Sequence, residues 1–225
     1  MKRRLPVKSE NLFDFEKSLA AELLKGAEYY YLIIDEIKEY ILRLARRLDM
    51  TEYVKLGHEI YVSRSARIAP TASILGPAII GGGTEIRSGA IIRGSVIIGR
   101  EAVIGNSSEV KNSIIFDRAA LPHYNYVGDS VIGYGAHFGA GAVTSNLKSI
   151  KSTVSVVIEG EKVDTGRRKL GAAVGDGAEI GCGAVLCPGT IIGKGSVVYP
   201  LCAVRGTVGE NTIYKGYGNT AIKEL

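Results

Sequence analysis

The chain has 225 residues, 29 glycines, no tryptophan and a formal net charge of +5. This length allows one large domain with a small appendage. The charge is mild and scattered, and no apolar stretch is long enough to span a membrane, so we expect neither nucleic acid nor membrane as a partner. Three cysteines without a Cys-x-x-Cys pair predict reduced thiols in a cytoplasmic protein.

Residues 1–52 are predicted to form an N-terminal helical segment. A shorter helix is expected from Phe13 to Leu24, ending near Gly26. A second, amphipathic helix is predicted because apolar residues recur at intervals of three and four, with Arg43, Arg46 and Arg47 toward solvent. Its apolar positions are Ile33, Ile37, Tyr40, Ile41, Leu44 and Leu48. We expect the helices to cover an open end of the following domain, and docking of a partner is the alternative.

A six-residue repeat dominates the middle of the chain. A period of six fits neither a helix nor a lone strand, and is typical of a solenoid of short strands and tight turns. We therefore predict an all-β solenoid, a parallel β-helix, over residues 53–206, in which residues 18 apart lie one above another. Nine consecutive hexads open with Ile68, Ile74, Ile80, Ile86, Ile92, Ile98, Ile104, Val110 and Phe116.

The repeat is interrupted twice. Its phase slips by four after residue 122 and resumes at Tyr126, which predicts that Pro122 to Asn125 bulge out of the coil. The hexads fade again over about residues 146–172, where an alternating stretch followed by a turn predicts a projecting hairpin. They return at Val174, and we expect an irregular C-terminal tail over residues 207–225.

Two groups of residues that break the pattern suggest chemistry. Arg93 and Lys111 are 18 residues apart and Arg87 lies one hexad before Arg93. Stacked about 4.8 Å apart, such charges repel unless an anion bridges them, which favours a phosphate site over solvated surface cations. His123 lies in the slip segment, where an imidazole could act as a general base. A surface histidine without a role is the alternative.

The histidines also raise the question of a metal. The gamma-type carbonic anhydrases, another group of hexapeptide solenoids, hold zinc with three histidines that include a closely spaced pair. The histidines here are His58, His123 and His137, and 14 residues separate the last two. This spacing does not match that group, so we expect no metal and no carbonic anhydrase activity.

Three segments carry a resemblance to a known family. Gly-Asn-Ser-Ser-Glu-Val-Lys-Asn (105–112), Leu-Pro-His-Tyr-Asn-Tyr-Val-Gly-Asp (121–129) and Phe-Gly-Ala-Gly-Ala-Val-Thr-Ser-Asn (138–146) resemble the acetyltransferase half of bifunctional glucosamine-1-phosphate acetyltransferase/N-acetylglucosamine-1-phosphate uridyltransferase. Asn-Leu-Lys (146–148) and Gly-Arg-Arg-Lys-Leu-Gly-Ala (166–172) look closer to archaeal sugar-1-phosphate nucleotidyltransferases that carry the same half. The similarity covers about residues 60–206. It implies a left-handed parallel β-helix, a homotrimer, and an acetyl-CoA site between neighbouring subunits.

The resemblance also implies roles for particular residues. His123 corresponds to the general base, and Arg93 and Lys111 to the phosphate-binding pair. Arg87, grouped with them by its position one hexad before Arg93, is also expected to bind substrate. Tyr126 corresponds to a sugar-contacting tyrosine and Asn146 to the asparagine that closes the site. Three further positions fall in the acetyl-CoA site: Ala140, Cys182 and Pro200.

Two departures from the family limit the assignment. His137 stands where the bacterial enzymes carry a substrate-binding asparagine, which leaves the acceptor open. The glycine-rich loop of the nucleotidyltransferase half is missing, so we expect no nucleotidyltransferase domain here. The predicted function is acetyl-CoA-dependent N-acetylation of an amino-sugar phosphate resembling glucosamine 1-phosphate. The alternatives are an acyltransferase with another acceptor, such as a nucleotide-linked amino sugar or a small amine, and a non-catalytic trimeric scaffold.

Overall fold

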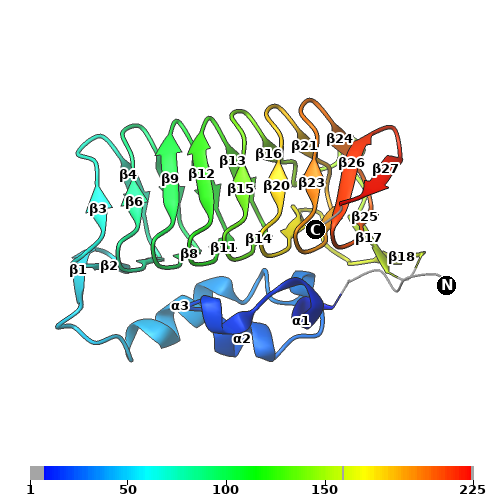
Figure 1. The fold of residues 1–225 in the computed structure, drawn as a ribbon. Coiled ribbons are helices and arrows are strands. Elements are labelled where there is room, and N and C mark those ends of the chain that lie inside the picture. The colour runs from blue at the N-terminus through cyan, green and yellow to red at the C-terminus, as the bar shows by residue number, and fades with distance from the viewer. Residues whose placement is uncertain (1–7, 159, 224–225) are drawn as a thin grey trace.

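The computed structural model describes residues 8–158 and 160–223. The chain winds into a parallel β-helix with three faces, which are sheets of nine, nine and seven strands, here called sheets A, B and C (Figure 1). Successive strands visit the three sheets in turn, so hydrogen-bonded neighbours within a sheet come from successive coils. The predicted parallel β-helix with an N-terminal helical segment is therefore confirmed.

The strands of each sheet are given in their spatial order. Sheet A contains β1 (Tyr53–Gly57), β2 (Ile60–Ser63), β5 (Ala78–Ile80), β8 (Val96–Ile98), β11 (Ser113–Ile115), β14 (Val131–Ile132), β19 (Ala173–Val174), β22 (Ile191–Ile192) and β25 (Thr207–Val208). Sheet B contains β3 (Arg67–Ile68), β6 (Glu85–Ile86), β9 (Val103–Asn106), β12 (Ala120–His123), β15 (His137–Phe138), β20 (Glu179–Ile180), β23 (Val197–Val198), β26 (Thr212–Gly216) and β27 (Asn219–Ile222). Sheet C contains β4 (Ser73–Leu75), β7 (Ile91–Arg93), β10 (Glu109–Lys111), β13 (Tyr126–Gly128), β16 (Val143–Thr144), β21 (Val185–Leu186) and β24 (Ala203–Val204).

The register of the coils corrects the predicted phase of the repeat. Ile98 pairs with Ile115, and Val110 pairs with Val127, so the coils are 17 residues long at these points instead of 18. Ile115 and Val127 therefore point into the solenoid core. Phe116, which was predicted to point inward, lies on the outer side of sheet A and packs against the helical segment.

The shorter coils arise at the corner between sheets C and A. Between β7 and β8 this corner uses two residues of positive φ, Gly94 and Ser95. In the next two coils a single residue of positive φ makes the turn, Asn112 (φ 44°) and then Asp129 (φ 50°). Asn and Asp adopt this left-handed conformation more readily than other residues with a side chain. One residue is therefore saved at each corner, and the hexad phase shifts there.

The segment expected to bulge out of the coil is instead regular. Pro122 and His123 belong to β12, and His123 pairs with Asn106 of β9. The following corner is held from inside by Asn125, which is buried and donates hydrogen bonds to Gly139 O (2.9 Å) and Ala142 O (3.0 Å). The expected bulge was an error caused by the phase shift at Asn112.

The helical segment lies along sheet A and does not cover an open end (Figure 1). Ile37 and Ile41 share one buried cluster with Ile79 and Ile97 from the outer side of sheet A. Phe13 packs on Phe116 with ring centroids 5.2 Å apart. The helical elements are α1 (Ser9–Leu12), η1 (Phe15–Lys17), α2 (Ala21–Lys25), η2 (Tyr30–Leu32) and α3 (Ile37–Ala45), where η denotes a 3₁₀ helix.

Both predicted helices are shorter in the structure. The first is broken into η1 and α2, because Ser18 Oγ accepts from Ala20 N (3.1 Å) and competes with the helical hydrogen bonds. It ends as expected, with Gly26 as the residue that caps α2. The second is reduced to α3, and Arg43 within it and Arg46 and Arg47 just after it are exposed, as predicted. No helix in the described ranges is long and apolar enough to cross a membrane.

Antiparallel hairpins close the two ends of the solenoid. β1 pairs with β2 at one end and β26 pairs with β27 at the other, so the expected irregular tail is instead β25 followed by this hairpin. The insertion between β16 and β19 forms another hairpin, β17 (Ser155–Ile158) with β18 (Glu161–Asp164). It rests against the solenoid, since Val156 is fully buried and Thr207 Oγ1 donates to Val157 O (2.7 Å).

Candidate active site

His123 lies at the corner between sheets B and C, in line with the residues predicted to contact acetyl-CoA. It pairs with Asn106 on the preceding coil. On the following coils Gly141 N donates to His123 O (3.0 Å), Gly183 N to Ala140 O (2.8 Å) and Leu201 N to Cys182 O (2.9 Å). Equivalent positions of successive coils thus form a line that we call the corner row: Asn106, His123, Ala140, Cys182 and Pro200.

A buried asparagine fixes the backbone of His123. Asn125 Oδ1 accepts from His123 N (3.1 Å), and Asn125 itself is bonded to the coil that follows. The imidazole is exposed at the end of a strand, so it is presented to solvent from a rigid backbone. A general base needs this combination of access and fixed position.

The other part of the corner row is composed of small side chains. Ala140, Cys182 and Pro200 are all exposed. A glycine precedes Ala140 and Cys182, and a Cβ added to Gly139 would lie 2.6 Å from Cys182 N. Glycine is therefore required for the close approach of the two coils. The small side chains and the glycines that precede two of them leave little bulk along this part of the row.

A second group of residues lies on sheet C and at its corner with sheet A. Arg93 ends β7, and the pairing of Val110 with Ile92 puts Lys111 beside it on the next coil. Each cation has a carboxylate close by: Arg93 Nη1 lies 2.5 Å from Glu109 Oε1, and Lys111 Nζ lies 4.0 Å from Asp129 Oδ1. The stacked cations are thus partly neutralised before any anion binds.

Asp129 connects this group to the two other predicted site residues. Its side chain accepts from Asn112 Nδ2 (2.7 Å) through Oδ1 and from Asn146 Nδ2 (2.5 Å) through Oδ2. Asn146 Nδ2 also donates to the Tyr126 hydroxyl (3.1 Å). Burial raises the pKa of the Tyr126 phenol above its ordinary value. We call this set the polar cluster: Arg93, Glu109, Lys111, Tyr126, Asp129 and Asn146.

Glu109 and Asp129 were not identified as site residues in the sequence. The five-residue interval between the inward residues Val127 and Ile132 was the available signal for Asp129. Such a short corner requires one left-handed residue, and Asp or Asn is favoured there. Nothing in the hexad pattern distinguishes Glu109 from a solvated surface carboxylate.

Arg87 and His137 lie outside the polar cluster. Arg87 follows β6 of sheet B, and its guanidinium is paired with Glu85 (Nη2 to Oε2, 2.9 Å). His137 begins β15, also in sheet B, with its Nδ1 2.9 Å from Glu179 Oε2. The structure therefore does not bring these two residues together with Arg93 and Lys111.

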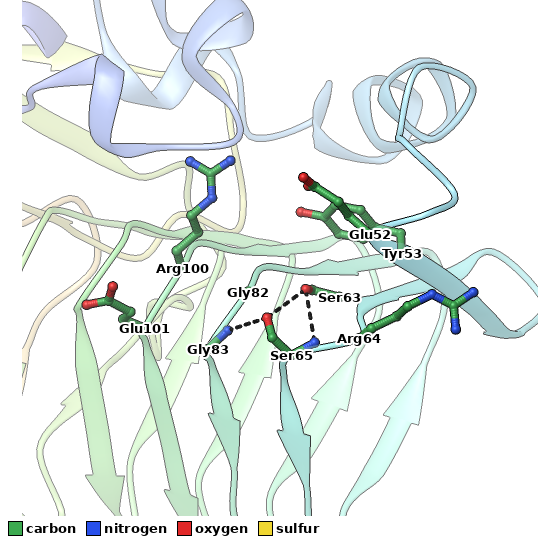
Figure 2. Close-up of a pocket in the computed structure, with 9 residues that line it drawn as sticks. All are labelled: Glu52, Tyr53, Ser63, Arg64, Ser65, Gly82, Gly83, Arg100 and Glu101. Carbon is green, nitrogen blue, oxygen red and sulfur yellow. Dashed lines mark hydrogen bonds between the residues drawn. The ribbon is translucent and has the colours of Figure 1, made fainter.

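A separate hollow of about 560 Å³ lies at the corner where sheets A and B meet, near β1 and β2 (Figure 2). Ser65 Oγ bridges its floor, accepting from Gly83 N (3.1 Å) and lying 3.1 Å from Ser63 Oγ. Two arginines and two glutamates balance one another in its lining, and none of the predicted site residues takes part. The lining residues are Glu52, Tyr53, Ser63, Arg64, Ser65, Gly82, Gly83, Arg100 and Glu101.

The described residues form no cluster suited to a metal ion. Within residues 8–158 and 160–223 no group of three or more His, Cys, Asp or Glu side chains converges. The side chain of His58 is 92% exposed and lies 3.8 Å from Glu59.

Comparison with known proteins supports the resemblance in the middle of the chain. The family described as the GMPPB C-terminal domain matches residues 74–170. The bifunctional sugar-1-phosphate nucleotidylyltransferase/acetyltransferase of Sulfurisphaera tokodaii is 38% identical over 105 residues, which are 47% of this chain and 26% of that protein. The bifunctional protein GlmU of Methanococcus maripaludis strain S2 is 40% identical over 106 residues, which are again 47% of this chain and 26% of that protein. The chain thus spans about a quarter of the length of these curated relatives.

Solved structures with a similar arrangement include a hexapeptide transferase family protein from Anaplasma phagocytophilum. It has 16% identity and a TM-score of 0.42, and the match covers 74% of this chain and 81% of that one. The N-acyltransferase AntD from Bacillus cereus, solved as a point mutant with dTDP and coenzyme A, has 16% identity and a TM-score of 0.38, with coverages of 76% and 89%. Likeness at this level carries no inference about ligands.

The repeats, the three-sheet coil and the matched relatives define a class, the hexapeptide-repeat acyltransferases, to which this chain is related. Within that class its relationship is to the C-terminal acetyltransferase region of GlmU and of the archaeal bifunctional nucleotidylyltransferase/acetyltransferases.

Proposed function

We propose that the protein is an N-acetyltransferase that moves an acetyl group from acetyl-CoA to the amino group of a sugar phosphate resembling glucosamine 1-phosphate. The main support is the position of His123 between two different surfaces. The small residues of the corner row follow it on successive coils, and Tyr126 of the polar cluster comes three residues later on the same coil. One surface suits an extended thioester, and the other suits a polar, anionic acceptor.

In the proposed reaction His123 acts as the general base. The imidazole takes a proton from the amine as its nitrogen bonds to the acetyl carbon and the carbon–sulfur bond breaks. The same imidazole then returns the proton to the departing thiolate, so atoms and charges balance. Positioning by the polar cluster makes direct transfer sufficient, without a covalent acyl-enzyme.

The polar cluster is proposed to bind the acceptor. Lys111 and Arg93 would hold the phosphate, since Lys and Arg are the usual donors of charge-assisted hydrogen bonds to this group. Tyr126 and Asn146 would contact the sugar. His137 and Arg87, which lie on sheet B, would contribute only if the acceptor or a neighbouring subunit extends across the corner.

A homotrimer is part of the proposal. The helical segment covers sheet A, whereas the corner row between sheets B and C is exposed and available to a neighbouring copy. Sedimentation at micromolar concentration should give a trimer. A monomer would remove the proposed intersubunit acetyl-CoA site.

The direct test combines the protein, acetyl-CoA and a panel of acceptors while free CoA thiol is measured. We expect release with glucosamine 1-phosphate, and slower release with unphosphorylated glucosamine. Faster release with a nucleotide-linked amino sugar or a small amine would favour the other acyltransferase function. If no acceptor is acetylated and no CoA ester raises the melting temperature, the protein is a non-catalytic scaffold.

A further inference from the structure

The orientation of the Asn146 side chain is determined by its neighbours. Its Nδ2 lies 2.5 Å from Asp129 Oδ2 and 3.1 Å from the Tyr126 hydroxyl. A carboxylate accepts hydrogen bonds and has none to donate, so the amide nitrogen has to face Asp129. Asn146 Oδ1 is then on the opposite arm of the carboxamide, and none of the described residues donates to it.

The same arrangement determines the direction of the Tyr126 hydrogen bond. Because the phenol oxygen accepts from Asn146, its own O–H is free to donate elsewhere. Among the described residues, Asn146 therefore keeps an unused acceptor, its Oδ1, and Tyr126 keeps an unused donor, its O–H.

Asp129 is itself firmly held. It is 4% exposed, and Asn112 Nδ2 donates to its Oδ1 (2.7 Å). Lys111 Nζ is 4.0 Å from that oxygen, which is too far for a hydrogen bond. The carboxylate thus keeps the ammonium nearby and leaves its N–H groups available.

We infer that Asp129 is a positioning residue that sets the donor and acceptor pattern of the acceptor site. Through Asn146 it turns a carboxamide oxygen toward the N–H of the substrate's amino group, and through Tyr126 it turns a hydroxyl donor toward an anionic oxygen. This inference rests on the proposed function and specifies how that site distinguishes an amine from a group of similar size without a hydrogen to donate.

The test uses Asp129→Asn, which keeps the shape and removes only the acceptor character of one atom. When Asn112 Nδ2 keeps its bond to the remaining oxygen, the new amide donates toward Asn146. Asn146 then has to turn its oxygen toward residue 129 and present its NH₂ to the acceptor. We expect KM for glucosamine 1-phosphate to rise about tenfold or more, because an amine donor then faces another donor. KM for acetyl-CoA should remain within about twofold, since that ligand is proposed to use Ala140, Cys182 and Pro200 of the corner row.

Calorimetry provides a readout that does not depend on turnover. The wild-type protein, with CoA present, should bind glucosamine 1-phosphate more tightly than 2-deoxy-2-fluoroglucose 1-phosphate, in which a fluorine without a hydrogen to donate replaces the amine. In Asp129→Asn this preference should disappear. Asp117→Asn is a matched control, because Asp117 Oδ1 accepts only a backbone bond from Arg100 N (2.6 Å) at another corner.

A second variant separates polarity from rigidity. Asn112→Gly tolerates the positive φ and deletes one hydrogen bond to Asp129, so it should lower the melting temperature and keep the preference for the amine. If Asn112→Gly abolishes the preference as fully as Asp129→Asn, or if Asp129→Asn keeps both KM and preference, the inference is wrong while the proposed function stands. If the wild-type protein neither acetylates nor prefers the amine, both fail.

Discussion

Replacing Lys111 with alanine should reduce recognition of a phosphorylated acceptor specifically. A charge-assisted hydrogen bond contributes about 1.5–3 kcal/mol, which corresponds to roughly a 10- to 150-fold change in KM. Lys111 should approach this range, because its Nζ is 4.0 Å from Asp129 Oδ1 and no strong ion pair has to be broken when phosphate binds. KM for unphosphorylated glucosamine should hardly change.

Arg93→Ala should have a larger effect than Lys111→Ala. Its guanidinium is already bonded to Glu109 at 2.5 Å, so removing it also leaves an uncompensated carboxylate beside the phosphate. The double variant should lose less than the sum of the single effects, because both cations address one group. Arg118→Ala is the control, since that side chain is paired with Glu101 (2.8 Å) outside the polar cluster and the corner row, and it should leave both KM values unchanged.

The assay compares KM for glucosamine 1-phosphate and glucosamine in each variant, with CoA release as the signal. Equal effects on both amines in Lys111→Ala and Arg93→Ala would refute the phosphate assignment. The acceptor would then be sought among amines without a phosphate at this position.

Two further predictions concern the fold. Phe116→Ala should reduce the free energy of unfolding by about 3–5 kcal/mol in urea titrations, and a cycle with Phe13→Ala should show coupling of about 0.5–1.5 kcal/mol. Phe138→Ala, inside the solenoid, should cost a similar amount without coupling to Phe13, and absence of coupling at Phe116 would contradict the packing of the helical segment. Burial raises the pKa of Asp176, so its proton is bound more tightly in the folded state. The contribution of Asp176 to the free energy of unfolding is therefore fully present at pH values below its pKa in the unfolded chain. It is lost as the pH rises through its pKa in the folded protein. The free energy of unfolding of the wild type minus that of Asp176→Asn should therefore decline as pH rises from about 4. A difference that grows with pH would contradict this.

Much of the fold could be predicted from the repeat, because one inward apolar residue per short strand leaves few alternatives to a solenoid. The phase could not be carried through the whole chain. Asn112 and Asp129 each replace a two-residue turn by one residue, and Ile115 and Phe116 are equally apolar, so the pattern alone did not show which points inward. The side of the solenoid covered by the helices also depends on outward residues that hexad counting ignores.

The candidate site could likewise be predicted from the sequence only in part. His123, Ala140 and Cys182 fall in one row because equivalent positions of successive coils are preserved after the shift. The short interval between Val127 and Ile132 marks Asp129 as a corner residue, but its bond to Asn146 and the pairing of Glu109 with Arg93 are side-chain contacts between coils that no spacing specifies. Arg87 was grouped with Arg93 by sequence distance, although one hexad moves a residue to the next face of the solenoid.

The most direct test of the central claim is the effect of His123→Ala on single-turnover acetyl transfer, with His58→Ala as the control because that side chain is 92% exposed. Loss of a general base should lower the rate of transfer to glucosamine 1-phosphate by about 10²- to 10⁴-fold. Binding of acetyl-CoA, measured by calorimetry, should be nearly unchanged, since the imidazole acts on the amine. Full activity of His123→Ala between pH 6 and pH 9 would contradict the proposed mechanism.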